Sequence, residues 1–135
     1  MALITWNSTY SVNVKEIDLQ HQKLIALINQ LHDGMKAGKG KEITGKILSD
    51  LADYTKFHFG YEEKLFDQTK YPDTMVQKRQ HSDLVKQVVN YISKFQKGEA
   101  ILTMELMNFL KDWLMNHIVA TDKKYTSFLN SKGIY

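Results

Sequence analysis

Apolar side chains recur at steps of three and four along most of the chain, the spacing that places residues on one face of an α-helix. The pattern predicts four helices, over residues 19–37, 41–69, 72–96 and 100–130. Short connections between helices of similar length favour antiparallel neighbours. We therefore expect an all-α fold, an antiparallel up-down-up-down four-helix bundle.

The expected helix ends carry recognisable signals. Asp18 is a candidate N-cap for the first helix, and glycines between residues 34 and 40 punctuate its end. The second helix is expected to end before Tyr71, because the residue before a proline resists helix. Pro72 suits the first turn of the third helix, and Gly98 is expected to close that helix.

Residues 1–17 lack the helical pattern and are expected to form an irregular N-terminal arm. Its apolar side chains, Trp6, Tyr10, Val12 and Val14, suggest that the arm packs onto the bundle. The sequence shows no repeat, linker or low-complexity segment, so residues 1–135 are interpreted as one domain.

The fourth predicted helix has a break in its periodicity. Its inner face consists of Leu102, Leu106, Leu110, Trp113 and His117. The next inward candidates are Asp122, Tyr125 and Leu129, and the step from His117 to Asp122 is five residues. A regular helix would rotate Asp122 away from His117, whereas a π-bulge would restore the alignment. We predict such a bulge near Ile118–Asp122.

Several titratable side chains lie on faces that should be apolar. They are His21, His58, Glu62, His81, His117 and Asp122. Each has an ordinary explanation alone: a buried histidine is usually hydrogen-bonded in the core, as we expect for His32, and a single acid can lie at the rim. Together they need a cation, because a buried carboxylate is costly without one and these faces carry no Lys or Arg. We therefore predict a metal centre.

The types of candidate ligand limit which metals the centre could hold. Imidazole and carboxylate without thiolate suit iron, manganese or zinc, and they do not single out iron. Two acids among so many ligands suggest bridging, and hence two metals. The chain has no cysteine, which excludes disulfides and iron–sulfur clusters and suits the cytoplasm.

Composition excludes other classes of function. The net charge is +3, but the Lys and Arg residues are scattered, so we expect no nucleic-acid binding. The N-terminus does not resemble a signal peptide, and no apolar run is long enough to span a membrane.

Specific motifs resemble those of the bacterial hemerythrins over the whole chain. They include Trp6, residues 17–24, 29–33, 58–63, 81–84 and 113–118, and Asp122. The family's ligand pattern is His, then His-x-x-x-Glu, then His-x-x-x-His, then His-x-x-x-x-Asp. This resemblance implies two non-heme iron ions bridged by an oxo or hydroxo group, with dioxygen as the ligand.

The resemblance also implies a role for each matching residue. Glu62 and Asp122 are expected to bridge the two irons. His21 and His58 are expected to hold one iron and leave a position open for dioxygen, while His81 and His117 hold the other. The expected lining of the oxygen pocket is Ile25, Trp113 and Leu114.

The sequence departs from the family pattern at Gln77, where the family has a third histidine for the second iron. Gln77 is a candidate ligand through its amide oxygen, a weaker donor than imidazole. Alternatively, it stands back and leaves the position to water. A third interpretation is a variant made to probe that ligand.

These observations lead us to expect reversible dioxygen binding, for transport, storage or delivery of oxygen. The alternative is an enzyme, a diiron peroxidase or an oxygen or peroxide detoxifier, which is favoured if Gln77 leaves the second iron open. A metal-free interaction module is a third class. Dioxygen is the expected partner, and the sequence identifies no redox or oxygen-receiving protein.

Overall fold

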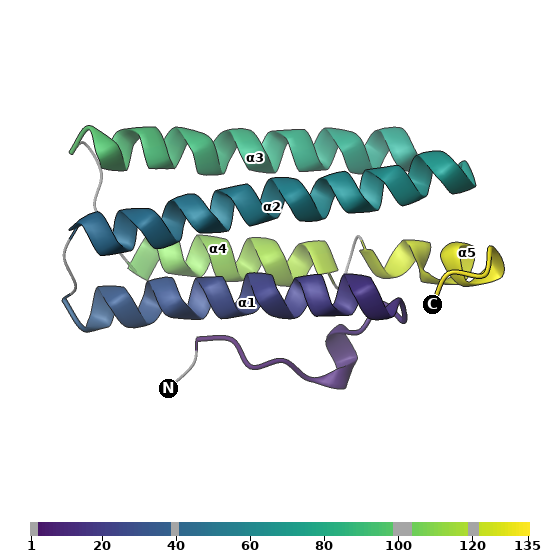
Figure 1. Ribbon diagram of the computed structural model, residues 1–135, viewed down its shortest axis with the longest axis horizontal. Helices are drawn as coiled ribbons and strands as arrows, with labels where there is room; N and C mark the ends of the chain where they lie inside the picture. The colour runs from purple at the N-terminus through teal and green to yellow at the C-terminus, as the bar shows by residue number, and fades with distance from the viewer. Residues whose placement is uncertain (1–2, 39–40, 99–103, 119–121) are drawn as a thin grey trace.

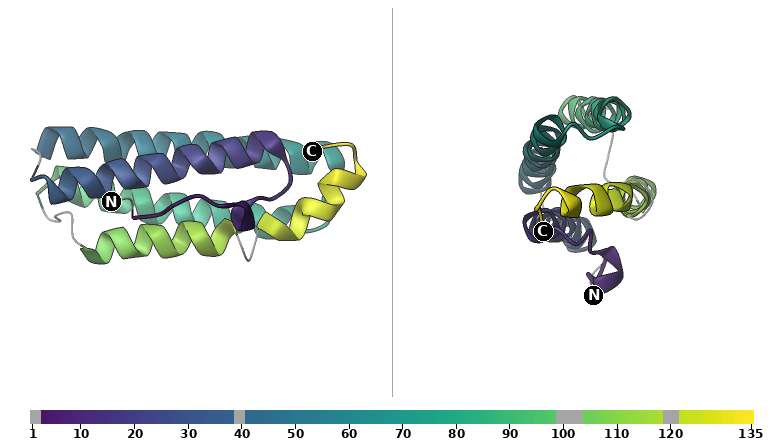
Figure 2. Two further views of the ribbon diagram at one scale, coloured as in Figure 1. Left: turned by 90° about the horizontal axis from the view of Figure 1, so that it is seen from below. Right: turned by 90° about the vertical axis from the view of Figure 1, so that its right-hand side faces the viewer.

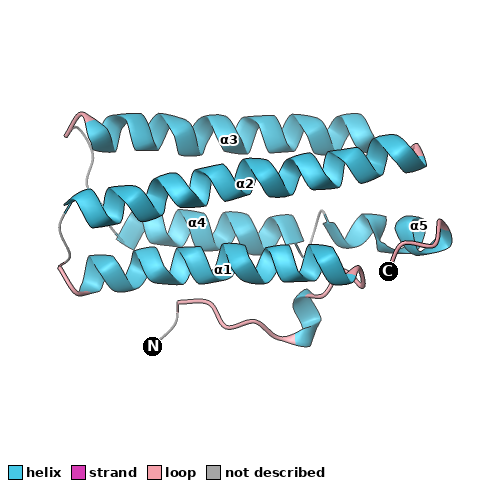
Figure 3. Cartoon of the chain, in the orientation of Figure 1, coloured by secondary structure: helices cyan, strands magenta, loops and turns pink. Residues whose placement is uncertain are grey.

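The periodic segments form helices that lie side by side with alternating direction (Figure 1). The computed structural model describes residues 3–38, 41–98, 104–118 and 122–135. The main helices are α1 (Lys15–Lys36), α2 (Lys41–Thr69), α3 (Thr74–Gln96) and α4 (Met104–Asn116). No strand occurs among the described residues (Figure 3). The all-α, four-helix expectation is confirmed.

The first helix begins four residues earlier than predicted, at Lys15, and the prediction of Asp18 as its N-cap is wrong. Val14 occupies that position and makes no side-chain capping bond. Asp18 lies within the first turn, and its carboxylate accepts hydrogen bonds from the Ser11 hydroxyl and, at 2.8 Å, from the Val12 backbone N–H. The acid therefore fastens the arm to the start of the helix.

Helix α3 begins at Thr74, two residues later than predicted, so Pro72 lies in the preceding turn and not in the first helical turn. The Thr74 hydroxyl donates to the Tyr71 carbonyl at 2.6 Å and fixes that turn. At the other end the prediction holds. Gly98 follows the helix with φ of +75°, a left-handed conformation that glycine adopts without strain.

The predicted fourth helix, residues 100–130, is interrupted. Helix α4 ends at Asn116, and the chain resumes as η3 (Asp122–Tyr125) and α5 (Thr126–Ser131). His117 and Ile118 are π-helical, as expected at the start of the predicted bulge; residues 119–121 lie outside the described residues. The inward placement predicted for Leu102 and Leu106 also falls outside the side chains that the structure describes.

The N-terminal arm packs along the bundle, as predicted (Figure 2). Val12 and Val14 are buried. The short helix η1 (Ser8–Tyr10) lies within the arm. The Asn29 side chain accepts a hydrogen bond from the Ile4 N–H at 3.0 Å and donates to the Ile4 carbonyl at 2.9 Å. These contacts hold the arm against α1.

Apolar side chains from every main helix fill the bundle, but a group of buried polar residues interrupts this core. These residues come from the first half of α1, the second half of α2, the first half of α3 and the segment that follows α4; they are His21, His58, Glu62, His81, His117 and Asp122. Antiparallel packing brings these four places to the same level of the bundle. None of the described helices has the length and apolarity that a membrane span requires.

We predict that Asp18→Ala lowers the free energy of unfolding by about 1–2 kcal/mol, because a charged acceptor for two hydrogen bonds is lost. The measurement is urea denaturation followed by circular dichroism. Asp53→Ala is the matched control, since Asp53 is exposed on α2. Equal shifts in the two variants would contradict the role given to Asp18.

Candidate metal centre

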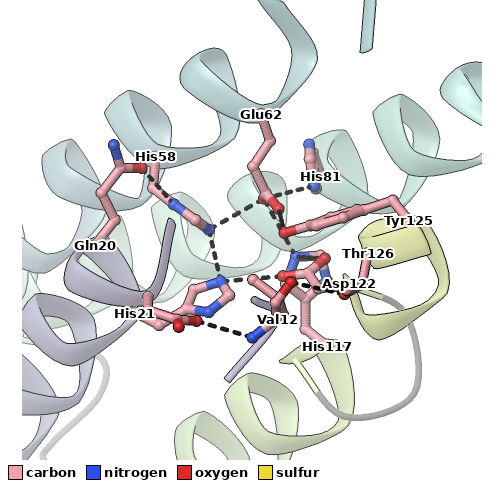
Figure 4. Close-up of polar contacts among 11 residues, drawn as sticks. Val12, Gln20, His21, His58, Glu62, His81, His117, Asp122, Tyr125 and Thr126 are labelled. Carbon is pink, nitrogen blue, oxygen red and sulfur yellow. Dashed lines mark hydrogen bonds and ion pairs between the residues drawn. The ribbon is translucent and has the colours of Figure 1, made fainter. Parts of the chain in front are cut away.

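Six predicted residues from three helices and the segment after α4 converge in the interior (Figure 4). The six are His21, His58, Glu62, His81, His117 and Asp122, and each is 4% exposed or less. Their helical spacing explains this convergence, because each lies on the buried face of its own element. The structure thus brings together six of the seven residues that the sequence analysis named, and their role as metal ligands stays a prediction.

The first half of the cluster combines His21, His58, Glu62 and Asp122. The Nε2 atoms of His21 and His58 are 3.1 Å apart. His21 Nε2 lies 3.0 Å from Asp122 Oδ2, and His58 Nε2 lies 3.0 Å from Glu62 Oε1. One ligand atom from each of the four residues lies within 4.8 Å of all the others, so the group could hold a metal ion.

The second half combines Glu62, His81 and His117, and it shares a carboxylate with the first. Glu62 Oε1 lies 3.5 Å from His81 Nε2 and 3.7 Å from His117 Nε2. Asp122 also faces both halves: its Oδ1 is 3.1 Å from His117 Nε2, while its Oδ2 faces His21. Two carboxylates that each face both groups are the arrangement expected for a pair of bridged metal ions.

The spacing of these atoms fits metal ligation. Ligands about 2.1 Å from an ion with near-octahedral geometry lie roughly 3 Å from their neighbours. Both oxygens of Asp122, Oε1 of Glu62 and Nε2 of His81 and His117 have no hydrogen-bond partner among the described residues. Buried polar atoms without hydrogen bonds are costly. A cation among them would satisfy these atoms together.

Burial sets the protonation states that a metal centre needs. It holds the pKa of His21 well below its ordinary value, with help from neighbouring His58, and it lowers the pKa of His81 to about 3. These imidazoles are therefore neutral near pH 7 and have a lone pair available for a metal.

The two carboxyl groups respond to burial in opposite ways. Burial raises the pKa of Asp122 well above its ordinary value, and neighbouring Glu62 adds to the rise. Burial acts on Glu62 in the same direction, but His58 and His117 outweigh it and hold the pKa of Glu62 well below its ordinary value. A cation would allow both acids to ionise, because it reverses the local electrostatic cost.

Three further residues orient the cluster from outside. Gln20 Oε1 lies 2.7 Å from His58 Nδ1, and Glu63 Oε2 lies 3.1 Å from His81 Nδ1. Protons held on Nδ1 leave the Nε2 lone pairs directed at the centre. The Tyr125 hydroxyl donates to Glu62 Oε2 at 2.6 Å. The helical spacing predicts Tyr125 on the inner face, but the spacing of residues gives no signal for the orienting contacts of these three side chains.

Gln77 is buried, 2% exposed, and lies one helical turn before His81 on α3. Its position is therefore on the same side of the helix as His81. Direct ligation through its amide oxygen stays a prediction.

The residues expected to line an oxygen pocket have different surroundings. Ile25 and Leu114 belong to the buried apolar core. Trp113 borders a cleft between α3 and α4 that extends to His117, and Ile25 and Leu114 do not line that cleft. A shared lining role for the three stays a prediction.

Comparison with known proteins identifies hemerythrins as relatives of this chain. A family model described as the hemerythrin HHE cation binding domain matches residues 12–129. A bacteriohemerythrin from Methylococcus capsulatus is 37% identical over 132 residues, covering 97% of this chain and 100% of that protein. A bacteriohemerythrin from Stenotrophomonas maltophilia is 35% identical over 125 residues, covering 93% of this chain and 80% of that protein.

Comparison with solved structures also identifies hemerythrin as similar to this chain. A crystal structure of wild-type hemerythrin superposes with a TM-score of 0.87 and 36% identity, covering 93% of this chain and 97% of that one. The chain therefore belongs to the hemerythrin family, whose four-helix bundle binds dioxygen at a centre of two non-heme iron ions.

Proposed function

We propose that this protein binds dioxygen reversibly and acts as an oxygen carrier, store or delivery protein. The observation that carries the proposal is the pair of ligand groups that share Glu62, with the two oxygens of Asp122 facing one group each. We assign two irons to these groups. The proposed ligands are His21, His58, Glu62, Gln77, His81, His117 and Asp122.

Held by the two ligand groups that share Glu62, a pair of ferrous ions would supply the electrons for reversible dioxygen binding. The chain's own part is to keep His21 and His81 neutral through burial and to orient the ligands. His58 is held by Gln20, and His81 by Glu63 and by the ring of Phe59, which stacks on it at 3.9 Å. Fixed ligands of this kind need little reorganisation when the oxidation state changes.

Exclusion of water is the second contribution of the chain. His21, His58, Glu62 and Asp122 are completely buried. On the side of His21 and His58, where we propose that dioxygen binds, Ile25 follows one turn after His21 on α1 and is 4% exposed. Dry, apolar surroundings limit proton delivery, and with it the loss of reduced oxygen as peroxide.

The alternative function is a diiron oxidoreductase such as a peroxidase or a detoxifier of oxygen or peroxide. One residue favours it: Gln77 is neutral and binds metals more weakly than the imidazole expected there. A weakly filled position on the second iron would accept an outside ligand. Action in the cytoplasm, without nucleic-acid or membrane partners, stays a prediction from composition.

Mixing the ferrous protein with oxygen in a stopped-flow spectrometer distinguishes the two functions. We expect a visible absorption band that persists for minutes and disappears under vacuum, with two irons per chain by elemental analysis. Rapid bleaching to the ferric state, together with turnover of a peroxidase dye, would identify the enzyme instead.

The variant Gln77→His tests the second iron. We expect autoxidation of the oxygenated protein to slow by roughly tenfold, because imidazole fills the position more firmly than an amide or water. Gln96→His, an exposed site on the same helix, is the matched control. Equal rates in both variants would show that residue 77 does not ligate iron, and an anomalous-scattering map at the iron edge would locate the side chain.

Removal of iron should make stability strongly dependent on pH. The folded state keeps His81 neutral down to about pH 3, whereas the unfolded chain takes up a proton near pH 6.5. The unfolded state therefore binds more protons between these values, so the stability of the iron-free protein falls as pH decreases, by about 1 kcal/mol per pH unit from this residue. Urea titrations of iron-free wild type and His81→Gln measure this slope, and identical slopes would contradict the assignment.

A further inference from the structure

A cleft of about 550 Å³ lies between α3 and α4, outside the ligand cluster. Its walls are formed by one face of each helix, and its inner end reaches His117. Of the proposed ligands, only His117 borders it. The volume is in the range of small-molecule binding sites.

The polar lining consists of hydrogen-bonding groups without a cation. Asp83 and Asp112 contribute carboxylates, and Gln80, Gln87 and Asn116 contribute amides. None of the described lining residues is Lys or Arg, although the chain contains 18 of them. Neither carboxylate forms a hydrogen bond or ion pair with another described residue. The cleft therefore suits a ligand with hydroxyl donors and disfavours anions.

The apolar lining suits a flat ring. Phe109 is 39% exposed, which is high for a phenylalanine, and it faces this cleft. Trp113 is only 8% exposed, and its indole N–H has no acceptor among the described residues. An aromatic ligand would pack on Phe109 and on the exposed edge of the Trp113 ring.

We propose that the α3–α4 cleft binds a quinol, an aromatic ring with two hydroxyl groups, and that this quinol returns electrons to the centre through His117. The electron-transfer part rests on the iron centre proposed above, whereas the binding part does not. Quinol hydroxyls donate to the carboxylates of Asp83 and Asp112, and the ring packs on Phe109. A quinol is thus the class of reductant that restores the protein after autoxidation.

The position of His117 provides the electron route. Its ring lies nearly parallel to that of Trp113, with an interplanar angle of 16° and centroids 6.3 Å apart. Its Nε2 lies 3.1 Å from Asp122 on the side of the centre. One imidazole therefore spans the distance between the cleft and the ligand cluster.

The electron count of a quinol matches that of the centre. Oxidation of one quinol to its quinone releases two electrons and two protons. Two ferric ions take up the two electrons and become ferrous. The protons leave through Asp83 and Asp112, which are exposed to solvent.

A second, smaller cavity with a mostly apolar lining lies next to the cleft. It has a volume of about 200 Å³, shares Gln87 and Phe109 with the first, and is otherwise lined by Leu48, Val88, Tyr91 and Leu110. Because the two cavities share Phe109, we expect quinols with an apolar ring substituent that packs on this residue to bind more tightly than the unsubstituted ring.

Resorcinol, a dihydroxybenzene that does not form a simple quinone, tests binding without electron transfer. Ligand-observed saturation-transfer NMR is recorded with the protein as isolated. We expect binding to wild type, and a dissociation constant roughly fivefold larger in Phe109→Ala because a ring contact is lost. Phe57→Ala is the matched control, since Phe57 is 57% exposed on α2 and does not line the cleft. No binding, or equal weakening in both variants, overturns the site.

Hydroquinone tests the electron role on the ferric, iron-loaded protein. We expect the reduction rate to saturate with hydroquinone concentration, to be inhibited by resorcinol, and to fall about fivefold in Phe109→Ala but not in Phe57→Ala. Reduction by dithionite, a small anion, should be unchanged in both variants. Resorcinol binding without saturable reduction overturns the role as electron donor. A chain that holds no iron overturns the proposed function, while the resorcinol measurement still decides the cleft.

Discussion

The structure depends on the burial of two carboxylates and four imidazoles in an apolar bundle. Glu62 and Asp122 are completely inaccessible to solvent, and no Lys or Arg forms an ion pair with them among the described residues. Such a cluster is unfavourable unless positive charge is supplied from outside the chain. The metal ions are therefore a part of the core that the amino-acid sequence leaves incomplete.

Helix geometry explains how distant parts of the chain meet at this cluster. His58 and Glu62 lie four residues apart on α2 and share one face. A continuous α-helix could not place His117 and Asp122 together in the same way, because five residues rotate the side chain past the inner face. The change to π-helix at His117 and the new helical start at Asp122 restore the alignment. With these two departures from a regular α-helix, Asp122 faces both ligand groups.

Sequence reasoning located the fold and the cluster because both depend on periodicity. Four histidines stand at inward positions where the helical spacing calls for apolar residues, so the hydrophobic pattern shows them directly; they are His21, His58, His81 and His117. The contacts of Gln20 and Glu63 were not predictable in this way, because they depend on the rotation of one helix against its neighbour.

Asp18 shows a second limit of prediction from sequence. Its side chain suits an N-cap, but it instead accepts hydrogen bonds from Ser11 and Val12, where the N-terminal arm turns into α1. The α3–α4 cleft likewise results from packing between elements and has no signal in the spacing of residues.

The fastening of the chain's two ends to each other has a consequence for synthesis. The Thr126 hydroxyl donates to the Val12 carbonyl at 2.7 Å, and the Asn130 amide donates to the Asn13 carbonyl at 3.1 Å, across more than 110 residues of sequence. Asp122 precedes these contacts directly and faces His21 from the opposite part of the chain. On the ribosome, α1, α2 and α3 emerge with three of the four histidines before the last bridging acid exists. Complete metal capture therefore comes after translation of nearly the whole domain, and a retained metal pair marks a chain whose two ends have already met.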